Sequence, residues 1–298
     1  MEKLIYMDNA ATTSTAPEVV SAMLPFFTEY YGNPSSVYNF AQKSKMAIED
    51  AREIIADSIG AAKSNEIYFT GGGSESDNWA LKSAAFGLRD KGNHIITTKI
   101  EHHAILNTCA YLEKNGFEVT YLDVDSEGFV SLEDVENAIT EKTILISVMF
   151  ANNEIGTIEP VCEIGEIAHK HGILFHTDAV QAMCHVPINV TEMNIDLLSA
   201  SAHKFHGPKG VGFMYMKNSA KLEPFIHGGA QERARRAGTS NVPGIVGMGQ
   251  AVKLALSTLD KDTHTIINMR NYIVDRILGE IPDVTFDGPC IDANAVSA

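Results

Sequence analysis

The regular alternation of short apolar runs with amphipathic segments restricts the fold of this chain more than any other feature. Seven runs of strand length lie between residues 66 and 216, and helical patterns fill most of the gaps, some closed by a glycine such as Gly116 or Gly172. Successive β-strand and α-helix units of this kind form a mostly parallel sheet. The sequence therefore predicts an α/β fold. The predicted strands are residues 66–70, 94–100, 118–122, 144–150, 173–176, 195–200 and 212–216.

Helical periodicity accounts for most of the remaining chain. The predicted helices are residues 16–27, 41–59, a segment after Ser74, 104–114, 132–140, 161–171, 242–259 and 263–281. A further strand is expected at residues 283–286. With 298 residues, of which 45% are hydrophobic, the chain can form one large domain and one small one.

The charge and hydropathy of the chain argue against two classes of binding partner. The net charge of −15 argues against binding to DNA, which requires clustered Lys and Arg to replace counterions. The apolar runs have the length of strands, well short of the roughly 20 residues that span a bilayer, and no signal peptide is evident. We therefore expect neither a nucleic acid nor a membrane as partner.

The four cysteines, Cys109, Cys162, Cys184 and Cys290, are scattered and include no CxxC pair. Their spacing indicates neither a disulfide framework nor a zinc site. We expect a reducing, cytoplasmic setting, in which buried structural thiols are the default for the first three.

In an open parallel sheet, ligands bind outside the carboxyl ends of the strands, and polar motifs follow several of the predicted strands here. The first is the turn Gly71-Gly72-Gly73-Ser74, which is either a plain connector or an anion site at a helix N-terminus. The second contains His102, which can stack on a flat ring or move protons. The third contains Asn152 and Asn153, which as an isolated motif would be read as turn formers.

Two further residues carry most of the chemistry. Asp178 ends a buried strand, where a carboxylate is costly unless it meets a cation or several donors. Lys204 comes one β unit later, and a lysine there is either a solvated loop residue or a buried amine that forms Schiff bases. An anion site, a stacking histidine, a carboxylate for a pyridinium nitrogen and such a lysine together predict a pyridoxal phosphate pocket.

Motifs along the whole chain resemble one family, the cysteine desulfurases of the class V aminotransferase group. The matching motifs are MDNAATT at residues 7–13, GNPSS at 32–36, EH at 101–102, NNEIG at 152–156, HTDAVQ at 176–181, SAHK at 201–204 and GGAQE at 228–232. The resemblance implies a three-layer, fold-type-I large domain of residues 16–257. Residues 1–15 and 258–298 would form part of a small α+β domain, which is expected to be incomplete.

The resemblance also implies a role for each site residue. Lys204 would hold pyridoxal phosphate covalently and then move protons, and His102 would stack on the pyridine ring. Asp178 would pair with the ring nitrogen, and Gln181 would hydrogen-bond the ring hydroxyl. The residues expected to cradle the phosphate are Gly73, Ser74, Ser201 and His203.

Two further implied roles concern the substrate and a second subunit. Asn153 would help to place the substrate carboxylate. Thr239 occupies the position that reaches the phosphate of a neighbouring subunit, so that the resemblance implies a homodimer with shared sites. Serine at position 74 replaces the usual threonine and offers the same hydroxyl.

The family reaction removes sulfur from L-cysteine, leaves L-alanine and passes the sulfur as a persulfide on an enzyme cysteine. The loop that carries this cysteine lies beyond the family segment that residues 292–298 resemble. We therefore expect a chain that binds the cofactor but is impaired in persulfide transfer, with Cys290 a weak candidate for the nucleophile.

Alternatives remain open at this stage. Selenocysteine lyases and other class V aminotransferases share most of these motifs. A non-catalytic relative that dimerises or docks to a sulfur carrier is a third alternative. A sulfur-acceptor or scaffold protein, for example in iron–sulfur cluster assembly, is an expected partner of the desulfurase.

Overall fold

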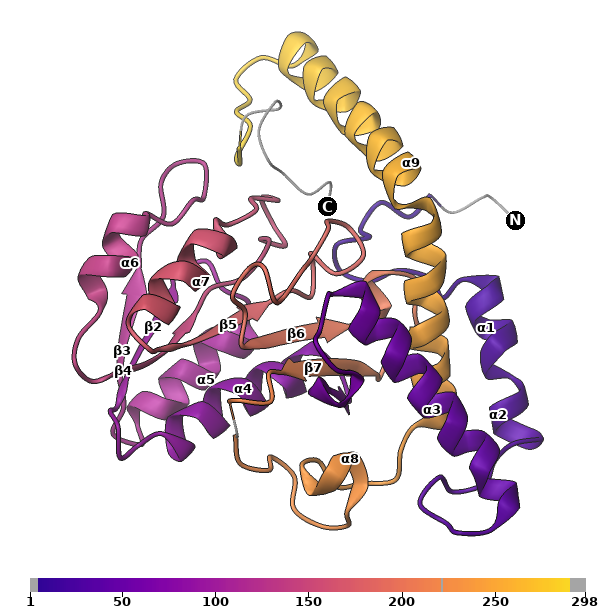
Figure 1. Cartoon of the computed structure of the whole chain (residues 1–298). Coiled ribbons are helices and arrows are strands. Elements are labelled where there is room, and N and C mark those ends of the chain that lie inside the picture. The colour runs from indigo at the N-terminus through magenta and orange to yellow at the C-terminus, as the bar shows by residue number, and fades with distance from the viewer. Residues whose placement is uncertain (1–4, 221, 290–298) are drawn as a thin grey trace.

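The fold is built on one seven-stranded sheet in which all seven predicted strands form, as the computed structural model of residues 5–220 and 222–289 shows (Figure 1). The strand order is β1-β7-β6-β5-β4-β2-β3, and β2 to β6 run parallel to one another while β7 is antiparallel to β1 and β6. The prediction of a mostly parallel α/β fold is confirmed. The strands are β1 Ile67–Thr70, β2 His94–Thr98, β3 Glu118–Leu122, β4 Thr143–Ser147, β5 Leu174–Asp178, β6 Leu197–Ser201 and β7 Gly212–Met216.

Helices cover both faces of this sheet, and the sheet separates the core into two apolar clusters. Successive strand residues point to opposite faces, so that Ile96 and Ile146 pack into one cluster while their neighbours Ile95 and Leu145 pack into the other. Residues of α3, α7 and α9 belong to the first cluster, and residues of α4 and α5 to the second. The helices are α1 Pro17–Met23, α2 Pro25–Thr28, α3 Asn39–Ser58, α4 Gly73–Gly87, α5 His103–Glu113, α6 Leu132–Ala138, α7 Val161–Lys170, α8 Gln231–Ala234 and α9 Val242–Glu280.

Helix α9 corrects one expectation, because it is a single helix of 39 residues rather than two. Residues 260–262, where a break was expected, include neither glycine nor proline and continue the helix. The helix is long and apolar enough to cross a membrane, with a mean hydropathy of 1.2 over 18 residues. Its first half packs against α1 and α3 and buries residues such as Met248 and Val252, and this packing accounts for much of its apolar character.

The strand expected at residues 283–286 does not form, and this prediction is wrong. Val284 and Phe286 are exposed, and no described strand lies beside this segment to supply a hydrogen-bonding partner. Cys290 lies outside the described residues. The proposed domain boundaries at residues 16 and 257 stay a prediction, although all seven strands fall between them.

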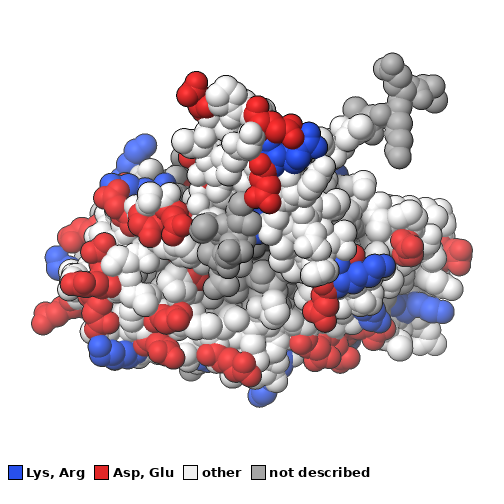
Figure 2. Space-filling view, turned by 90° about the horizontal axis from the view of Figure 1, so that it is seen from above, with Lys and Arg blue, Asp and Glu red and all other residues white. Residues whose placement is uncertain are grey.

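The surface carries many carboxylates, as the net charge of −15 requires. On the face shown in Figure 2, acidic side chains are spread over the molecule with basic side chains among them. Several carboxyl groups are instead buried, and Glu159 is one of them. It accepts a hydrogen bond from the backbone N–H of Val130 at 3.0 Å through Oε2, and Oε1 has no partner in the described part of the chain.

Burial raises the pKa of Glu159 from its ordinary 4.5 to about 7. The folded state therefore binds one more proton than the unfolded state between these values, so that the stabilisation is complete below pH 4.5 and is lost as the pH rises through 7. We expect Glu159→Gln to increase the free energy of unfolding at alkaline pH by up to about 3 kcal/mol and to flatten its pH dependence. Urea unfolding across the pH range measures this effect. The exposed Glu163→Gln is the control and should behave as the wild type.

Candidate functional site

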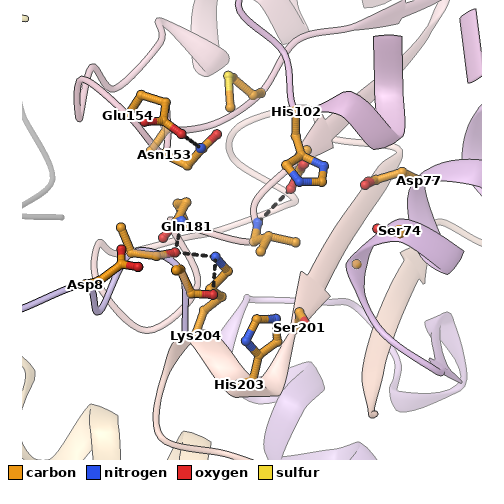
Figure 3. A pocket seen from close by; sticks show the side chains of 17 residues that line it. Asp8, Ser74, Asp77, His102, Asn153, Glu154, Gln181, Ser201, His203 and Lys204 are labelled. Carbon is orange, nitrogen blue, oxygen red and sulfur yellow. Dashed lines mark hydrogen bonds between the residues drawn. The ribbon is translucent and has the colours of Figure 1, made fainter. Parts of the chain in front are cut away.

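A cavity of about 390 Å³ opens at the carboxyl edge of the sheet, within the range of roughly 300–1,000 Å³ common for small-molecule sites (Figure 3). Strands β1, β2, β4, β5 and β6 all end at this edge, and residues 8–11 of the N-terminal segment lie across it. The structure brings nine of the ten predicted site residues to this cavity. They are Gly73, Ser74, His102, Asn153, Asp178, Gln181, Ser201, His203 and Lys204.

Lys204 lies in a short 3-10 turn directly after β6 and is half-buried. Its Nζ donates to the carbonyl oxygens of Ala10 and Ala11 in the N-terminal segment. Burial lowers the pKa of this amine, and the carboxylates of Asp178, Asp8 and Glu154 partly oppose the shift. The site thus holds a positioned amine that loses its proton more readily than an exposed lysine, as a nucleophilic lysine requires.

Asp178 ends β5 and is buried, with Oδ1 accepting a hydrogen bond from the backbone N–H of Val180 at 2.9 Å. Burial raises the pKa of this carboxyl group, while the Val180 N–H and the nearby His102 and Lys204 act in the opposite direction. A cation with an N–H group directed at Asp178 would offset the cost of burying its charge. A protonated pyridine nitrogen is such a group.

Two side chains flank the position that a ring would occupy. His102 is the N-cap of α5, and its Nδ1 accepts a hydrogen bond from the backbone N–H of Ala104 at 3.1 Å. This bond leaves the proton of a neutral imidazole on Nε2. Gln181 donates through Nε2 to the carbonyl oxygen of Ala10 at 2.9 Å, which ties the N-terminal segment to the cavity.

The other end of the cavity suits an anion. Gly72 has a φ of +150°, a conformation that favours glycine, and α4 starts at Gly73 with free backbone N–H groups. Ser201 and His203 line both this cavity and an adjoining hollow of about 560 Å³, which Lys209 also lines. Helix N-terminal N–H groups, hydroxyls and cations bind phosphates.

Gly73 makes this anion cradle possible, because a Cβ atom on it would lie 2.5 Å from Cγ2 of Val180. We expect Gly73→Ala to weaken binding of pyridoxal phosphate by about tenfold or more, since the backbone must shift away from the phosphate. Absorbance titration of the cofactor-free protein measures the dissociation constant. Gly87→Ala at the other end of α4 is the control, since its Cβ would meet nothing closer than 4.0 Å. Equal affinity in both variants would contradict the assignment.

The two neighbouring asparagines in the segment after β4 have different roles. Asn152 accepts hydrogen bonds from the backbone N–H groups of Glu154 and Ile155 and donates to the carbonyl oxygen of Ile100, so that it shapes the turn. Asn153 lines the cavity and donates to Oε1 of Glu154 at 2.9 Å. Only Asn153 is placed to contact a ligand.

Thr239 is the one predicted site residue that the structure does not bring to the cavity. It is exposed and lines a separate hollow of about 180 Å³ together with Arg236. Its predicted contact belongs to a neighbouring subunit, so that one chain does not test it.

The burial of the three described cysteines agrees only in part with the prediction. Cys109 and Cys184 are buried, and burial raises the pKa of each thiol to about 12. Cys162 is exposed, because it lies on the outer side of the first turn of α7, and the expectation of a buried thiol is wrong there. None of these three thiols lines the cavity.

Other cavity residues were missed in the sequence. Asp77, on α4, is buried and lines the cavity together with Met149 from the segment after β4. Neither residue belongs to a motif that points to chemistry. The available signal was an aspartate among the apolar residues of a helix that follows a glycine-rich turn, where a buried carboxyl group requires an explanation.

The residues present fit pyridoxal phosphate. A half-buried lysine, a buried carboxyl group and a phosphate cradle that a Cβ at position 73 would obstruct lie in one cavity, and the buried Oδ1 of Asp77 has no partner among the described atoms. The fold and the site define a pyridoxal phosphate-dependent enzyme of the aminotransferase type. Residues 5–297 match the aminotransferase class-V family, and the chain belongs to it.

Similar proteins agree with this assignment. The chain is 59% identical to a protein of Clostridium botulinum named cysteine desulfurase IscS, over 97% of this chain and 72% of that protein. A solved structure titled NifS-like protein superposes with a TM-score of 0.90 at 42% identity, covering 92% of this chain and 76% of the other. A structure titled SspA in complex with cysteine gives a TM-score of 0.82 at 47% identity, covering 84% and 72%.

Proposed function

We propose that the chain acts as a pyridoxal phosphate-dependent cysteine desulfurase, which removes sulfur from L-cysteine and leaves L-alanine. The single observation that carries this proposal is the placement of the Lys204 amine and the buried Asp178 carboxyl group in one cavity. The relatives named cysteine desulfurase and the related structure with bound cysteine support the choice of substrate.

Each residue contributes a distinct step of binding or proton transfer. When bound, the cofactor supplies an electron-withdrawing ring that stabilises negative charge at the substrate α-carbon. Asp178 keeps a proton on the ring nitrogen by offering a buried negative charge. Lys204 Nζ removes the proton from the substrate α-carbon and returns one to the product, and its lowered pKa suits this exchange. Asn153 donates its amide N–H to the substrate carboxylate.

His102 is the second proton carrier that we propose. Its ring lines the cavity and carries its exchangeable proton on Nε2, because Nδ1 accepts from Ala104. The thiol that accepts sulfur is not among the three described cysteines, since Cys109 and Cys184 are buried and Cys162 does not line the cavity. We therefore expect turnover to depend on an added thiol when the chain is tested alone.

The oligomeric state, the sulfur acceptor and the location in the cell are also proposals. We propose a homodimer, in which Thr239 reaches the phosphate site of the partner, and a sulfur-acceptor or scaffold protein that takes the product sulfur. We also propose a cytoplasmic location, consistent with free cysteine thiols in the described residues.

A direct assay separates the desulfurase from its alternatives. The protein loaded with pyridoxal phosphate is incubated with L-cysteine and dithiothreitol, and alanine and sulfide are quantified. We expect the two products in equal amounts. Alanine from L-selenocysteine but not from L-cysteine would favour a selenocysteine lyase, and no product from either would favour a non-catalytic relative.

A further inference from the structure

Asp77 is a second buried carboxyl group at the cavity, with no role in the proposed function so far. It lies on α4, is 1% exposed, and its carboxyl group points toward His102 in Figure 3. Its Oδ1 atom has no hydrogen-bond partner among the described residues and lies 3.8 Å from Nε2 of His176. A buried, unpartnered oxygen at the edge of a ligand site is costly and calls for a partner.

A chain of buried polar groups leads from the sheet to Asp77. The Ser147 hydroxyl lies 2.9 Å from Nδ1 of His176, Nε2 of His176 lies 3.0 Å from the Ser199 hydroxyl, and the same Nε2 lies 3.8 Å from Oδ1 of Asp77. All four side chains are buried. The chain therefore connects strands β4, β5 and β6 with helix α4.

The direction of these hydrogen bonds can be worked out. Burial lowers the pKa of His176 to about 3, so that its ring carries a single N–H. Within the described part of the chain, the Ser147 hydroxyl has no acceptor other than His176 Nδ1. Ser147 then donates to Nδ1 and Nε2–H donates to Ser199, so that no N–H of His176 is left for Asp77. Oδ1 of Asp77 accepts no hydrogen bond from the described residues, and the carboxyl group is free to carry a proton.

The charges around Asp77 favour its neutral form. An Asp77 oxygen, an Asp178 oxygen and a ring nitrogen of His102 all lie within 4.8 Å of one another. Burial and the negative charges of Asp178 and Glu101 raise the pKa of Asp77 well above its ordinary value, and the neutral His176 supplies no opposing charge. Two carboxyl groups so close in a buried site do not both ionise.

We propose that Asp77 is a positioning residue that stays a neutral carboxylic acid and donates its proton to Asp178. Asp178 then carries the negative charge that would pair with the ring nitrogen, with one oxygen held by Asp77 and the backbone N–H of Val180 and the other left for the cofactor. The inference rests on pyridoxal phosphate as the bound group. It extends the proposed function by explaining how a single carboxylate is oriented in a site that contains two.

Infrared spectroscopy of the holoprotein with carbon-13-labelled aspartate tests this protonation state. At neutral pH we expect a carboxylic acid band that shifts with the label, which separates Asp77 from the buried Glu101 and Glu159. Asp77→Asn should remove the band, because the amide cannot ionise or show a carboxylic acid stretch.

Cofactor affinity gives a second measurement. The amide of Asp77→Asn can still donate to Asp178, so we expect this variant to bind pyridoxal phosphate within about threefold of the wild type and Asp77→Ala to bind about tenfold more weakly. The absence of a label-sensitive band, or a band that persists in Asp77→Asn, would overturn the proposal. Neither measurement uses turnover, so that a failure of the desulfurase assay would leave this test intact.

Discussion

Replacing Lys204 with alanine is expected to lower the rate of alanine formation from L-cysteine by about 10³-fold or more. The variant loses the amine that holds the cofactor and exchanges the α-carbon proton, two functions that no other described side chain in the cavity can supply. The visible absorbance of bound pyridoxal phosphate should also change, because the cofactor can then bind only reversibly.

Two further variants test this prediction: one keeps the positive charge of Lys204 without its nucleophilic amine, and the other is a control. Lys204→Arg keeps a cation near Ala10 and Ala11 but provides no nucleophilic amine, and we expect as large a loss. Lys170→Ala removes an exposed lysine that pairs with Glu136 far from the cavity and should leave the rate unchanged. Near-normal turnover in Lys204→Ala would remove the basis of the mechanism.

Replacing Asp178 with asparagine is expected to have the second largest effect, a fall of about 10²–10³-fold in turnover. A neutral amide no longer stabilises a proton on the ring nitrogen, so that the ring withdraws electrons less strongly. The affinity for pyridoxal phosphate should also decrease. Steady-state kinetics with saturating cofactor separates the two contributions.

The control for this variant is Asp196, a buried aspartate directly before β6. Asp196 accepts a hydrogen bond from the backbone N–H of Phe175 and lies 3.0 Å from His169, outside the cavity. We expect Asp196→Asn to lower the thermal stability and to leave the cofactor affinity unchanged. If Asp178→Asn affected only stability in the same way, Asp178 would be a structural residue.

The sequence predicted the sheet and much of the site because both depend on local signals. Strands such as β4 and β6 are short, apolar and separated by helical patterns, which is sufficient to place them. Asp178 and Lys204 were found because polar residues directly after buried strands gather at one edge of a parallel sheet. The hydrogen bonds of Lys204 to Ala10 and Ala11 depend on tertiary packing and were not predictable from spacing.

Other features required the folded structure. The chain through Ser147, His176 and Ser199 joins three strands, and each residue alone is an ordinary polar residue in a strand. Asp77 became visible as a site residue only when α4 was placed across β5 and β6. The predicted break in α9 at residues 260–262 does not form, because the polar residues there are compatible with a helix.

The most direct measurement locates the cofactor on the chain. The holoprotein is treated with borohydride, which fixes pyridoxal phosphate to the lysine that holds it, and the digested protein is analysed by mass spectrometry. We predict a phosphopyridoxyl group on the peptide that contains Lys204 and on no other lysine, including the nearby Lys209. A label on a different lysine, or bound cofactor that borohydride fails to attach, would contradict the central role of Lys204.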